Sequence, residues 1–227
     1  MTHVLFWDID GTLLSTARAG VFALEDAGRE VLGVDSSFAE LRTAGLTDYE
    51  VAALAIRTAG RSDDAATVTA FLRAYERMLP DRLHSRQGAV MPGVIEILEH
   101  LNGRGDVMNL LLTGNTREGA SAKLAHYGLT SYFVDGAFCV DGDGRVAIAR
   151  RALALATERI GAEPERDAVT VIGDTPADVR CGQAIGARTV AIASGAYSRE
   201  QLEELAPSVV LEDLPSPGEF TALLGIG

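Results

Sequence analysis

The sequence predicts an α/β fold in which a doubly wound parallel sheet carries an inserted all-helical domain. Three observations favour this fold: a short apolar run near the N-terminus, a long stretch of helical periodicity after it, and alternating strand and helix patterns from residue 91 onward. Strands that are separated by single helices need right-handed crossovers, and such crossovers produce a parallel sheet with helices on both faces.

The first element is a buried strand at residues 3–7, an apolar run that stops at Asp8. Apolar residues then recur at helical spacing over residues 16–75, so we expect that stretch to be helical throughout. Because the strand pattern resumes only later, residues 16–86 are predicted to form a separate helical domain. The α/β core would then comprise residues 1–15 and 87–227, with linkers near residues 14–16 and 86–91.

The second half of the chain repeats one pattern, a strand followed by a helix that begins with proline or a capping residue and ends before glycine. The strands are predicted at residues 107–112, 168–172, 189–192 and 209–211. The helices are predicted at residues 92–101, 116–127, 148–160 and 176–185, and a short one follows the capping box of Ser198 and Gln201.

The bulk composition limits the possible functions. With 227 residues, of which 47% are hydrophobic and 23% charged, the chain can bury a substantial core and is unlike a disordered chain. The formal net charge of -12 disfavours nucleic acids and anionic membrane surfaces as partners. A small anionic substrate is still compatible with this charge, because a metal ion and a few donors can reverse the field within one pocket.

Neither export nor a membrane anchor is expected. The sequence has no apolar run of the about eighteen residues that a membrane span needs, and its apolar N-terminal stretch is too short for a signal peptide and lacks a basic leader. Cys139 and Cys181 lie far apart and form no CxxC unit, as is typical of reduced thiols. We therefore expect a cytoplasmic protein.

Polar residues follow three of the predicted strands. They occupy residues 8–12 after the first strand, residues 113–115 after the second and residues 173–178 after the third. Because ligands of open parallel sheets bind beyond the carboxyl ends of the strands, we expect these three clusters to converge on one site.

Asp8 and Asp10 are two residues apart, so an extended chain would point both side chains to the same side. With Asp174 they would form a group of three carboxylates, whose mutual repulsion calls for a neutralising cation. Mg²⁺ is the expected occupant, because it binds one or two carboxylates together with water and a substrate phosphate. Two alternatives stay open: Asp8 and Asp10 could belong to an ordinary turn, and Asp178 could simply favour the first turn of its helix.

Taken together, these motifs resemble those of the haloacid dehalogenase superfamily of phosphotransferases. The match rests on residues 8–12, on Thr113 and on Asp174 with Asp178, and it covers the whole chain. The resemblance implies a Rossmann-like core, and the helical insert is similar to the C1-type cap of that family. The segment 113–115, with Lys123 and Leu124 downstream, looks most like the phosphoglycolate-phosphatase-like branch.

The resemblance implies covalent catalysis in two steps. Asp8 would attack phosphorus in line and form an aspartyl-phosphate, while Asp10 would first protonate the leaving oxygen and then activate water. Mg²⁺ would be held by Asp8, by the backbone carbonyl of Asp10 and by Asp174, with Asp178 orienting these ligands.

The resemblance also implies a phosphate-binding group at the end of the second strand. Thr113 would donate to a phosphoryl oxygen, helped by the backbone amides of Gly114 and Asn115 at the start of the next helix.

The family further supplies a basic residue, usually lysine, before the third motif, and no lysine stands there. Arg145 is the expected substitute. Lys123 is the second candidate, although a lysine within a helix is usually solvated, so its loss is expected to reduce activity less. Arg150 and Arg151 are further possibilities. Residues 141–144 superficially resemble a calcium-binding loop, but Arg145 occupies a ligand position and no Glu closes the loop, so a turn is expected.

Residues 42–48, between two predicted helices of the insert, carry polar side chains around a glycine. In similar proteins such a loop faces the active site and screens substrates, while cap closure excludes water. Arg42, Thr43, Thr47 and Asp48 are therefore candidate specificity residues. Alternatively, the segment is a helix–helix turn in which Thr47 or Asp48 only caps a helix.

The leading hypothesis is an Mg²⁺-dependent phosphatase that hydrolyses a small phosphorylated metabolite, with phosphoglycolate as one candidate. A sugar phosphomutase of the same superfamily is a second enzyme hypothesis. A 2-haloacid dehalogenase is disfavoured, because those enzymes need no metal and lack the second aspartate, which Asp10 provides here. A non-catalytic protein that binds a phosphorylated metabolite would be expected to have lost Asp8, Asp10 or Asp174. The sequence leaves the oligomeric state open.

Overall fold

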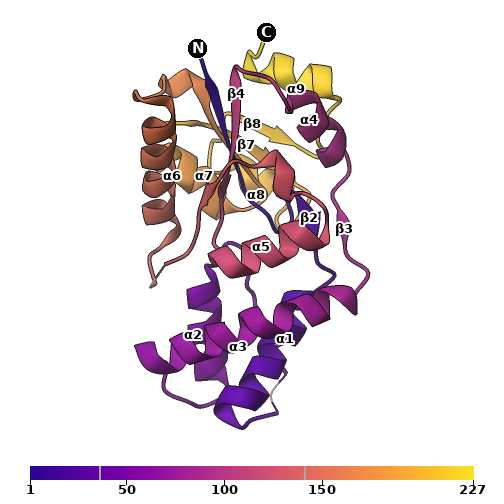
Figure 1. The fold of residues 1–227 in the computed structure, drawn as a ribbon, viewed down its shortest axis with the longest axis vertical. Helices are drawn as coiled ribbons and strands as arrows, with labels where there is room; N and C mark the ends of the chain where they lie inside the picture. The colour runs from indigo at the N-terminus through magenta and orange to yellow at the C-terminus, as the bar shows by residue number, and fades with distance from the viewer. Residues whose placement is uncertain (36, 141) are drawn as a thin grey trace.

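The strand β1 (His3–Trp7) lies inside a parallel sheet of six strands, in the order β5-β4-β1-β6-β7-β8. This computed structural model describes residues 1–35, 37–140 and 142–227. A block of helices from the first third of the chain lies below the sheet (Figure 1). The predicted fold class, a doubly wound parallel sheet with an inserted helical part, is confirmed.

The other strands of the sheet are β4 (Val107–Leu112), β5 (Gly136–Ala137), β6 (Val169–Gly173), β7 (Arg188–Ile192) and β8 (Val209–Leu211). The helices that connect or flank them are α4 (Val94–Leu101), α5 (Arg117–His126), α6 (Arg145–Ile160), α7 (Pro176–Ala184), α8 (Arg199–Glu203) and α9 (Pro217–Leu224), with the short 3-10 helices η2 (Thr130–Tyr132) and η3 (Arg166–Ala168).

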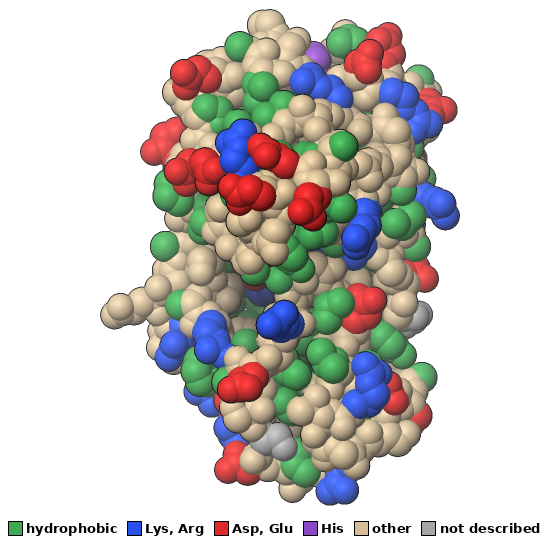
Figure 2. Space-filling view, turned by 180° about the vertical axis from the view of Figure 1, so that it is seen from behind, with side chains coloured by type: hydrophobic (Ala, Val, Ile, Leu, Met, Phe, Trp, Pro, Cys, Tyr) green, Lys and Arg blue, Asp and Glu red, His purple; other side chains and the backbone are tan. Residues whose placement is uncertain are grey.

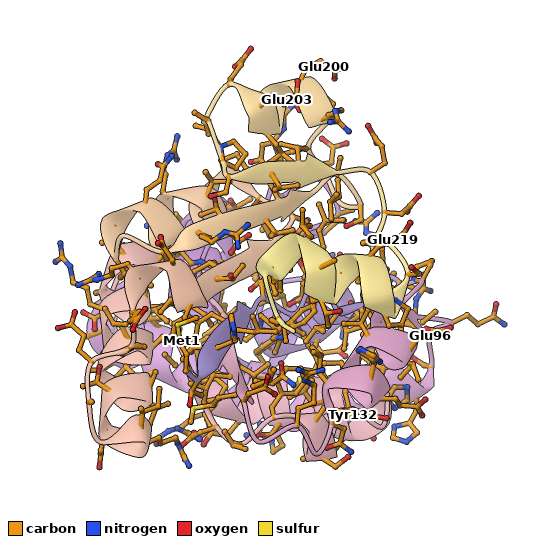
Figure 3. The ribbon with its side chains drawn as sticks, turned by 90° about the horizontal axis from the view of Figure 1, so that it is seen from above. Met1, Glu96, Tyr132, Glu200, Glu203 and Glu219 are labelled. Atoms are coloured by element: carbon orange, nitrogen blue, oxygen red, sulfur yellow. The ribbon has the colours of Figure 1, made fainter. Side chains whose placement is uncertain are left out.

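Both faces of the sheet are buried, as the continuous apolar run of β1 predicts. Leu5 and Trp7 pack on one side in a cluster with α4 and α9. Val4 and Phe6 pack on the other side in a cluster with α6. Seen from above, the strands lie between these two layers of helices (Figure 3). The alternation of side chains along β1 therefore supplies the core of both layers.

Three elements of the core differ from the predictions. β5 was not predicted, because a strand of two small residues gives no apolar run. α9 was not predicted either, although Ser216 and Glu219 form a capping box at its start. α6 begins at Arg145 rather than at residue 148, and its N-cap is Gly144, which has no side chain to signal the start. Asp141, in the predicted turn 141–144, lies outside the described residues.

The helical part contains α1 (Ala19–Ala27), the π-helix η1 (Gly28–Leu32), α2 (Asp48–Thr58) and α3 (Ala65–His84). Their apolar faces form a core of their own. The expectation that residues 16–75 are helical throughout is wrong, because the described residues between Gly33 and Thr47 form no helix. Gly33 has a φ of 65°, a left-handed conformation that ends the π-helix, and Gly45 has a φ of 81°.

Two short strands join the helical part to the sheet. β2 (Leu14–Ser15) and β3 (Ala89–Val90) pair with each other in an antiparallel arrangement. The backbone N–H of Met91 donates to the carbonyl of Leu13 at 2.9 Å, which extends this contact. Both strands lie where linkers were predicted, and the domain limits at residues 16 and 86 stay a prediction.

The strand order creates a topological switch point between β1 and β6. From β1 the chain moves to β4 and β5 on one side, and it then returns to β6, β7 and β8 on the other side. In doubly wound sheets, ligands bind in the crevice beyond the carboxyl ends of the strands at such a point. Asp8 directly follows β1 and Asp174 directly follows β6, so these two carboxylates flank the crevice.

The surface of the sheet-containing part is acidic. Acidic side chains gather on this part in the rear view (Figure 2), in line with the net charge of -12. Glu200 and Glu203 of α8 lie at the top of the view in Figure 3, at the edge of the molecule. Across the described ranges, no helix combines the length and the apolar composition that crossing a membrane requires.

Candidate active site

A cavity of about 320 Å³ lies between the carboxyl edge of the sheet and the helical part. On the core side it is lined by residues after β1, β4 and β6. On the opposite side it is lined by α1, by the loop before α2 and by Tyr75 of α3. The surface is hollowed between these two parts of the molecule in the rear view (Figure 2). The cavity thus coincides with the switch point of the sheet.

Three buried carboxylates come together at this edge: Asp8, Asp174 and Asp178. One oxygen of each lies within 4.8 Å of the others, and the residues are 6%, 2% and 3% exposed. The carboxylate of Asp178 accepts hydrogen bonds from the backbone N–H and the hydroxyl of Thr175 at 3.1 and 2.7 Å. This capping box at the start of α7 fixes Asp178 beside the other two carboxylates.

Burial and mutual repulsion make Asp8 and Asp174 reluctant to ionise. Burial raises the pKa of Asp8 to about 7, with Asp178 adding to the effect and Arg145 opposing it. Burial, together with Asp178 and Asp8, raises the pKa of Asp174 to about 8. A cation among these oxygens would favour the ionised forms, so the cluster is suited to binding one.

Arg145, the first residue of α6, points into the cluster. Its Nη1 and Nη2 both lie 3.4 Å from Oδ1 of Asp8, and Nη2 also donates to Oδ1 of Asp178. Burial acts to lower the pKa of Arg145, but the two carboxylates outweigh burial and raise it. Within the described part of the chain, no acceptor reaches its buried Nε. The structure therefore places Arg145 beside Asp8 with no described acceptor for its Nε, and its role as the basic residue of the family stays a prediction.

The carboxylate of Asp10 turns away from this cluster. Its Oδ2 accepts a hydrogen bond from Nζ of Lys123 at 2.6 Å and another from Nδ2 of Asn115 at 2.8 Å. Lys123 also donates to Oδ1 of Asn115, and Nδ2 of Asn115 donates to Oγ1 of Thr113 at 2.8 Å. A connected polar network thus joins Asp10 to the turn after β4.

Two of these placements differ from the sequence-based expectations. The carboxylate that completes the buried group is that of Asp178, not that of Asp10, because β1 ends at Trp7 and its alternation does not extend to Asp10. The backbone carbonyl of Asp10 stays a predicted metal ligand. Lys123 is 4% exposed rather than solvated, because α3 packs against α5.

The turn after β4 is closely packed. Thr113 is fully buried, and its Oγ1 accepts hydrogen bonds from the backbone and side chain of Asn115 at 3.3 and 2.8 Å. A hydroxyl has one proton and two acceptor positions, so Thr113 still has its proton to donate. Gly114 lines the cavity, and a Cβ there would lie 2.9 Å from Nη1 of Arg145. Glycine at this position therefore allows Arg145 to approach the turn.

The four candidate specificity residues of the segment 42–48 have different surroundings. Thr43 and Asp48 line the cavity. Thr47 is fully buried and caps α2: its Oγ1 accepts the backbone N–H of Glu50 at 3.2 Å, and Glu50 accepts the N–H of Thr47 at 2.8 Å. Arg42 is exposed and does not line the cavity. The capping alternative thus describes Thr47, whereas Thr43 and Asp48 reach the candidate site.

No individual role was predicted for several neighbours of Asp174, although Gly11 and Thr12 belong to the predicted cluster 8–12. Oγ1 of Thr12 donates to Oδ1 of Asp174 at 3.3 Å. Gly11 and Gly195 leave room for this carboxylate, since a Cβ at either would come within 2.4 or 1.8 Å of Oδ2. Gly195 follows β7, whose carboxyl end lies at the same edge, and that strand end was the available signal. Arg18 of the helical part also lines the cavity, and no pattern in the sequence marks it.

The cluster of Asp8, Asp174 and Asp178 fits a hard divalent cation. Its donor atoms are carboxylate oxygens, the ligands that Mg²⁺ prefers in proteins. Arg145 supplies part of the positive charge that the cluster needs, and the pKa values of Asp8 and Asp174 stay raised beside it. The residues present are therefore suited to Mg²⁺.

Comparison with known proteins agrees with the motifs. Residues 2–186 match the family model of the haloacid dehalogenase-like hydrolases. A phosphoglycolate phosphatase of Rhodospirillum rubrum is 30% identical over 236 residues, which cover 97% of this chain and 91% of that protein. A phosphoglycolate phosphatase of Synechococcus elongatus is 28% identical over 223 residues, which cover 92% of each chain.

A solved structure supports the fold. CbbY from Rhodobacter sphaeroides, determined in complex with phosphate, has a TM-score of 0.75 and 18% identity, and the match covers 94% of this chain and 95% of that one. The predicted resemblance is confirmed by the family match, which extends over most of the chain. The chain therefore belongs to the haloacid dehalogenase-like hydrolases, and it is an enzyme similar to the phosphoglycolate phosphatases of that family.

Proposed function

We propose that the protein is an Mg²⁺-dependent phosphatase that hydrolyses a small phosphomonoester through an aspartyl-phosphate on Asp8. The placement of Asp8 at the switch point, beside Asp174, Asp178 and Arg145, carries this proposal. A carboxylate that attacks a phosphoryl group needs positive charge nearby, because both partners are anionic. Arg145 and the cation site beside Asp8 meet that need.

In the first step, a carboxylate oxygen of Asp8 attacks phosphorus while the bond from phosphorus to the ester oxygen breaks. Arg145 and the hydroxyl of Thr113 donate to the phosphoryl oxygens, where negative charge is held. The unused Nε of Arg145 and the free proton of Thr113 are consistent with this role.

Mg²⁺ bound by Asp8, Asp174 and the backbone carbonyl of Asp10 would add Lewis-acid stabilisation of the same charge. Asp178 would orient these ligands, because its own carboxylate is fixed by Thr175.

Asp10 acts as general acid in the first step and as general base in the second. Lys123 and Asn115 both bind Oδ2, which fixes the carboxylate and leaves Oδ1 for proton transfer. Oδ1 gives its proton to the leaving oxygen, and it later takes a proton from the water that attacks phosphorus. Inorganic phosphate leaves and Asp8 is regenerated. The Asp10 side chain is 43% exposed, so substrate and water can reach it.

The cavity favours a small substrate, since about 320 Å³ suits a metabolite and not a polymer. The relatives from Rhodospirillum rubrum and Synechococcus elongatus are phosphoglycolate phosphatases, so phosphoglycolate is the first substrate to test. Cys139 and Cys181 are free and buried, which is consistent with the cytoplasmic location that we propose.

The test is a screen of the purified protein with Mg²⁺ against a panel of phosphomonoesters, with Asp8→Asn as the paired variant. We expect release of inorganic phosphate by the wild type and its loss in the variant. No turnover of any ester, or undiminished turnover in Asp8→Asn, would overturn the proposal. Isomerisation of a sugar phosphate without phosphate release would favour a phosphomutase instead, and halide release without Mg²⁺ would favour a dehalogenase.

A further inference from the structure

Asp48, the first residue of α2, joins the helical part to the core through two hydrogen bonds. Its backbone N–H donates to the carbonyl of Gly114 at 2.8 Å. Its carboxylate Oδ2 accepts the backbone N–H of Thr116 at 2.7 Å. One residue of the helical part therefore binds Gly114, within the turn that we assign to phosphate binding, and Thr116, directly after that turn.

This contact depends on close approach at two glycines of the core. A Cβ at Gly114 would lie 2.7 Å from the carbonyl oxygen of Leu46 and 3.1 Å from Cα of Thr47. A Cβ at Gly119 would lie 3.3 Å from Oδ2 of Asp48. A side chain at Gly114 would push the loop before α2 away from the core, and one at Gly119 would crowd the carboxylate of Asp48, so both glycines fit the docked arrangement.

The carboxylate of Asp48 lies at the N-terminus of α5, the helix that carries Lys123. Thr116 is the N-cap of α5, and its Oγ1 accepts the N–H of Gly119 at 3.1 Å while its own N–H is bound by Asp48. A negative charge at a helix N-terminus interacts favourably with the helix dipole. Burial raises the pKa of Asp48 to about 6, although Lys123 and the Thr116 N–H oppose the shift. Asp48 is thus electrostatically linked to Lys123 as well as to the turn.

We propose that Asp48 is a positioning residue that fastens the helical part to the core and holds the turn 113–116 and Lys123 in the geometry that catalysis needs. This inference rests on the proposed function. Lys123 fixes Oδ2 of Asp10, so a loosened first turn of α5 would misplace the general acid without removing any group that touches the substrate. A residue that positions the general acid acts alike on substrates whose leaving groups match in pKa, whereas a specificity residue discriminates between such substrates by shape.

The kinetic test compares Asp48→Ala and Asp48→Asn on esters whose leaving groups differ in size and shape but have similar pKa values, so that a misplaced general acid affects each ester equally. Asp48→Ala should lower kcat about tenfold or more, by the same factor for each ester, with a smaller change in KM. Asp48→Asn should recover part of the loss, because its amide oxygen can accept the Thr116 N–H. Because asparagine matches aspartate in size, this variant also keeps the test possible if Asp48→Ala fails to fold. The matched control is Asp64→Ala: Asp64 caps α3 in the same helical part, accepts the Thr67 N–H at 3.0 Å, and should leave kcat unchanged.

A second readout needs no substrate. Lys123 is the single lysine of the chain, so an amine-reactive reagent reports this side chain besides the N-terminal amine. Because Lys123 is buried, Asp48→Ala should accelerate its labelling and the hydrogen exchange of residues 116–123, and Asp64→Ala should change neither.

Wild-type labelling and exchange rates in both Asp48 variants would overturn the positioning role. A kcat factor that varies with the size or shape of the leaving group at matched leaving-group pKa would also overturn it and would place Asp48 in contact with the substrate. If the wild type hydrolyses no ester, the proposed function fails, and labelling and exchange still decide whether Asp48 fastens the two parts together.

Discussion

Arg145 and Asp8 form a buried ion pair, in which both Nη atoms of the guanidinium lie 3.4 Å from Oδ1 of the carboxylate. Arg145 is the first residue of α6, and Asp8 directly follows β1, so the two residues are far apart in the sequence. The same guanidinium donates to Asp178. The proposed nucleophile therefore has a fixed positive charge beside it before any substrate arrives, which favours the approach of an anionic phosphoryl group.

Arg145→Ala should lower kcat by about 100-fold or more, because it removes a donor that is preorganised for the transferring phosphoryl group. Arg145→Lys should recover only part of the activity, since one ammonium cannot reproduce the planar fork that contacts both Asp8 and Asp178. Arg150→Ala, which alters an exposed side chain of the same helix, is the matched control. Steady-state kinetics would check the series, and wild-type turnover in Arg145→Ala would exclude this arginine from the mechanism.

Some residues of the site could be predicted from the sequence and others could not, depending on whether local or long-range interactions bring them together. The proximity of Asp8, Thr113 and Asp174 could be predicted, because the carboxyl ends of parallel strands meet at one edge of a sheet. The burial of Lys123 could not be predicted. It depends on α3, which packs against α5 from a distant part of the sequence, and a lysine within an uncovered helix would be solvated.

Lys123→Met should lower kcat about tenfold or more, because Asp10 loses one of the two donors that fix its Oδ2. It should also lower the free energy of unfolding by about 1–3 kcal/mol, since Oδ1 of Asn115 loses its buried donor. Arg117→Ala removes a positive charge from the exposed side of the same helix and should change stability by less than about 1 kcal/mol. Urea unfolding and kinetics measure both effects. A Lys123→Met protein with wild-type kcat would contradict the assigned contact with Asp10.

The stability of the metal-free protein should fall as pH rises from about 4 to about 8. An unfolded aspartate has a pKa of about 4, whereas burial raises the pKa of Asp8 to about 7 and that of Asp174 to about 8. In this window the folded protein keeps protons that the unfolded chain has lost, so the free energy of unfolding decreases with pH.

Mg²⁺ should oppose this loss, because it binds the ionised carboxylates. The rise in melting temperature on adding Mg²⁺ should therefore be larger at about pH 8 than at about pH 5.5. Asp174→Asn should reduce both the slope of stability with pH and the Mg²⁺ effect. An equal Mg²⁺ effect at both pH values would contradict the assignment of the metal site to these residues.

The fold shows a similar division between local and long-range information. Strands β1, β4 and β8 could be predicted because each is an apolar run with a distinct end. Strand β5 could not, because Gly136 and Ala137 become a strand only by pairing with Leu111 and Leu112 of β4. The helical stretch was extended too far before residue 48, because Phe38 lies in a non-helical loop and is nevertheless 1% exposed, so an apolar residue there does not indicate a helix.

Gly114→Ala should separate the two sides of the active site. The new Cβ would lie 2.7 Å from the carbonyl oxygen of Leu46, 2.9 Å from Nη1 of Arg145 and 3.1 Å from Cα of Thr47. Overpacking of this kind costs about 1–3 kcal/mol, and the loop before α2 can relieve it by moving off the core. We therefore expect kcat to fall about tenfold or more, with faster amine labelling of Lys123.

Gly105→Ala is the matched control, because Gly105 lies in an exposed loop where a Cβ would meet no atom within 4 Å. It should leave both kcat and the labelling of Lys123 unchanged. Gly114→Ala could lower kcat without faster labelling of Lys123. In that case the new methyl group displaces Arg145 while the loop before α2 stays in contact with the core, and the effect belongs to phosphoryl binding alone. Wild-type kcat in Gly114→Ala would show that turnover does not require this close contact, because a methyl group cannot fit while the loop, the turn and Arg145 keep their present distances.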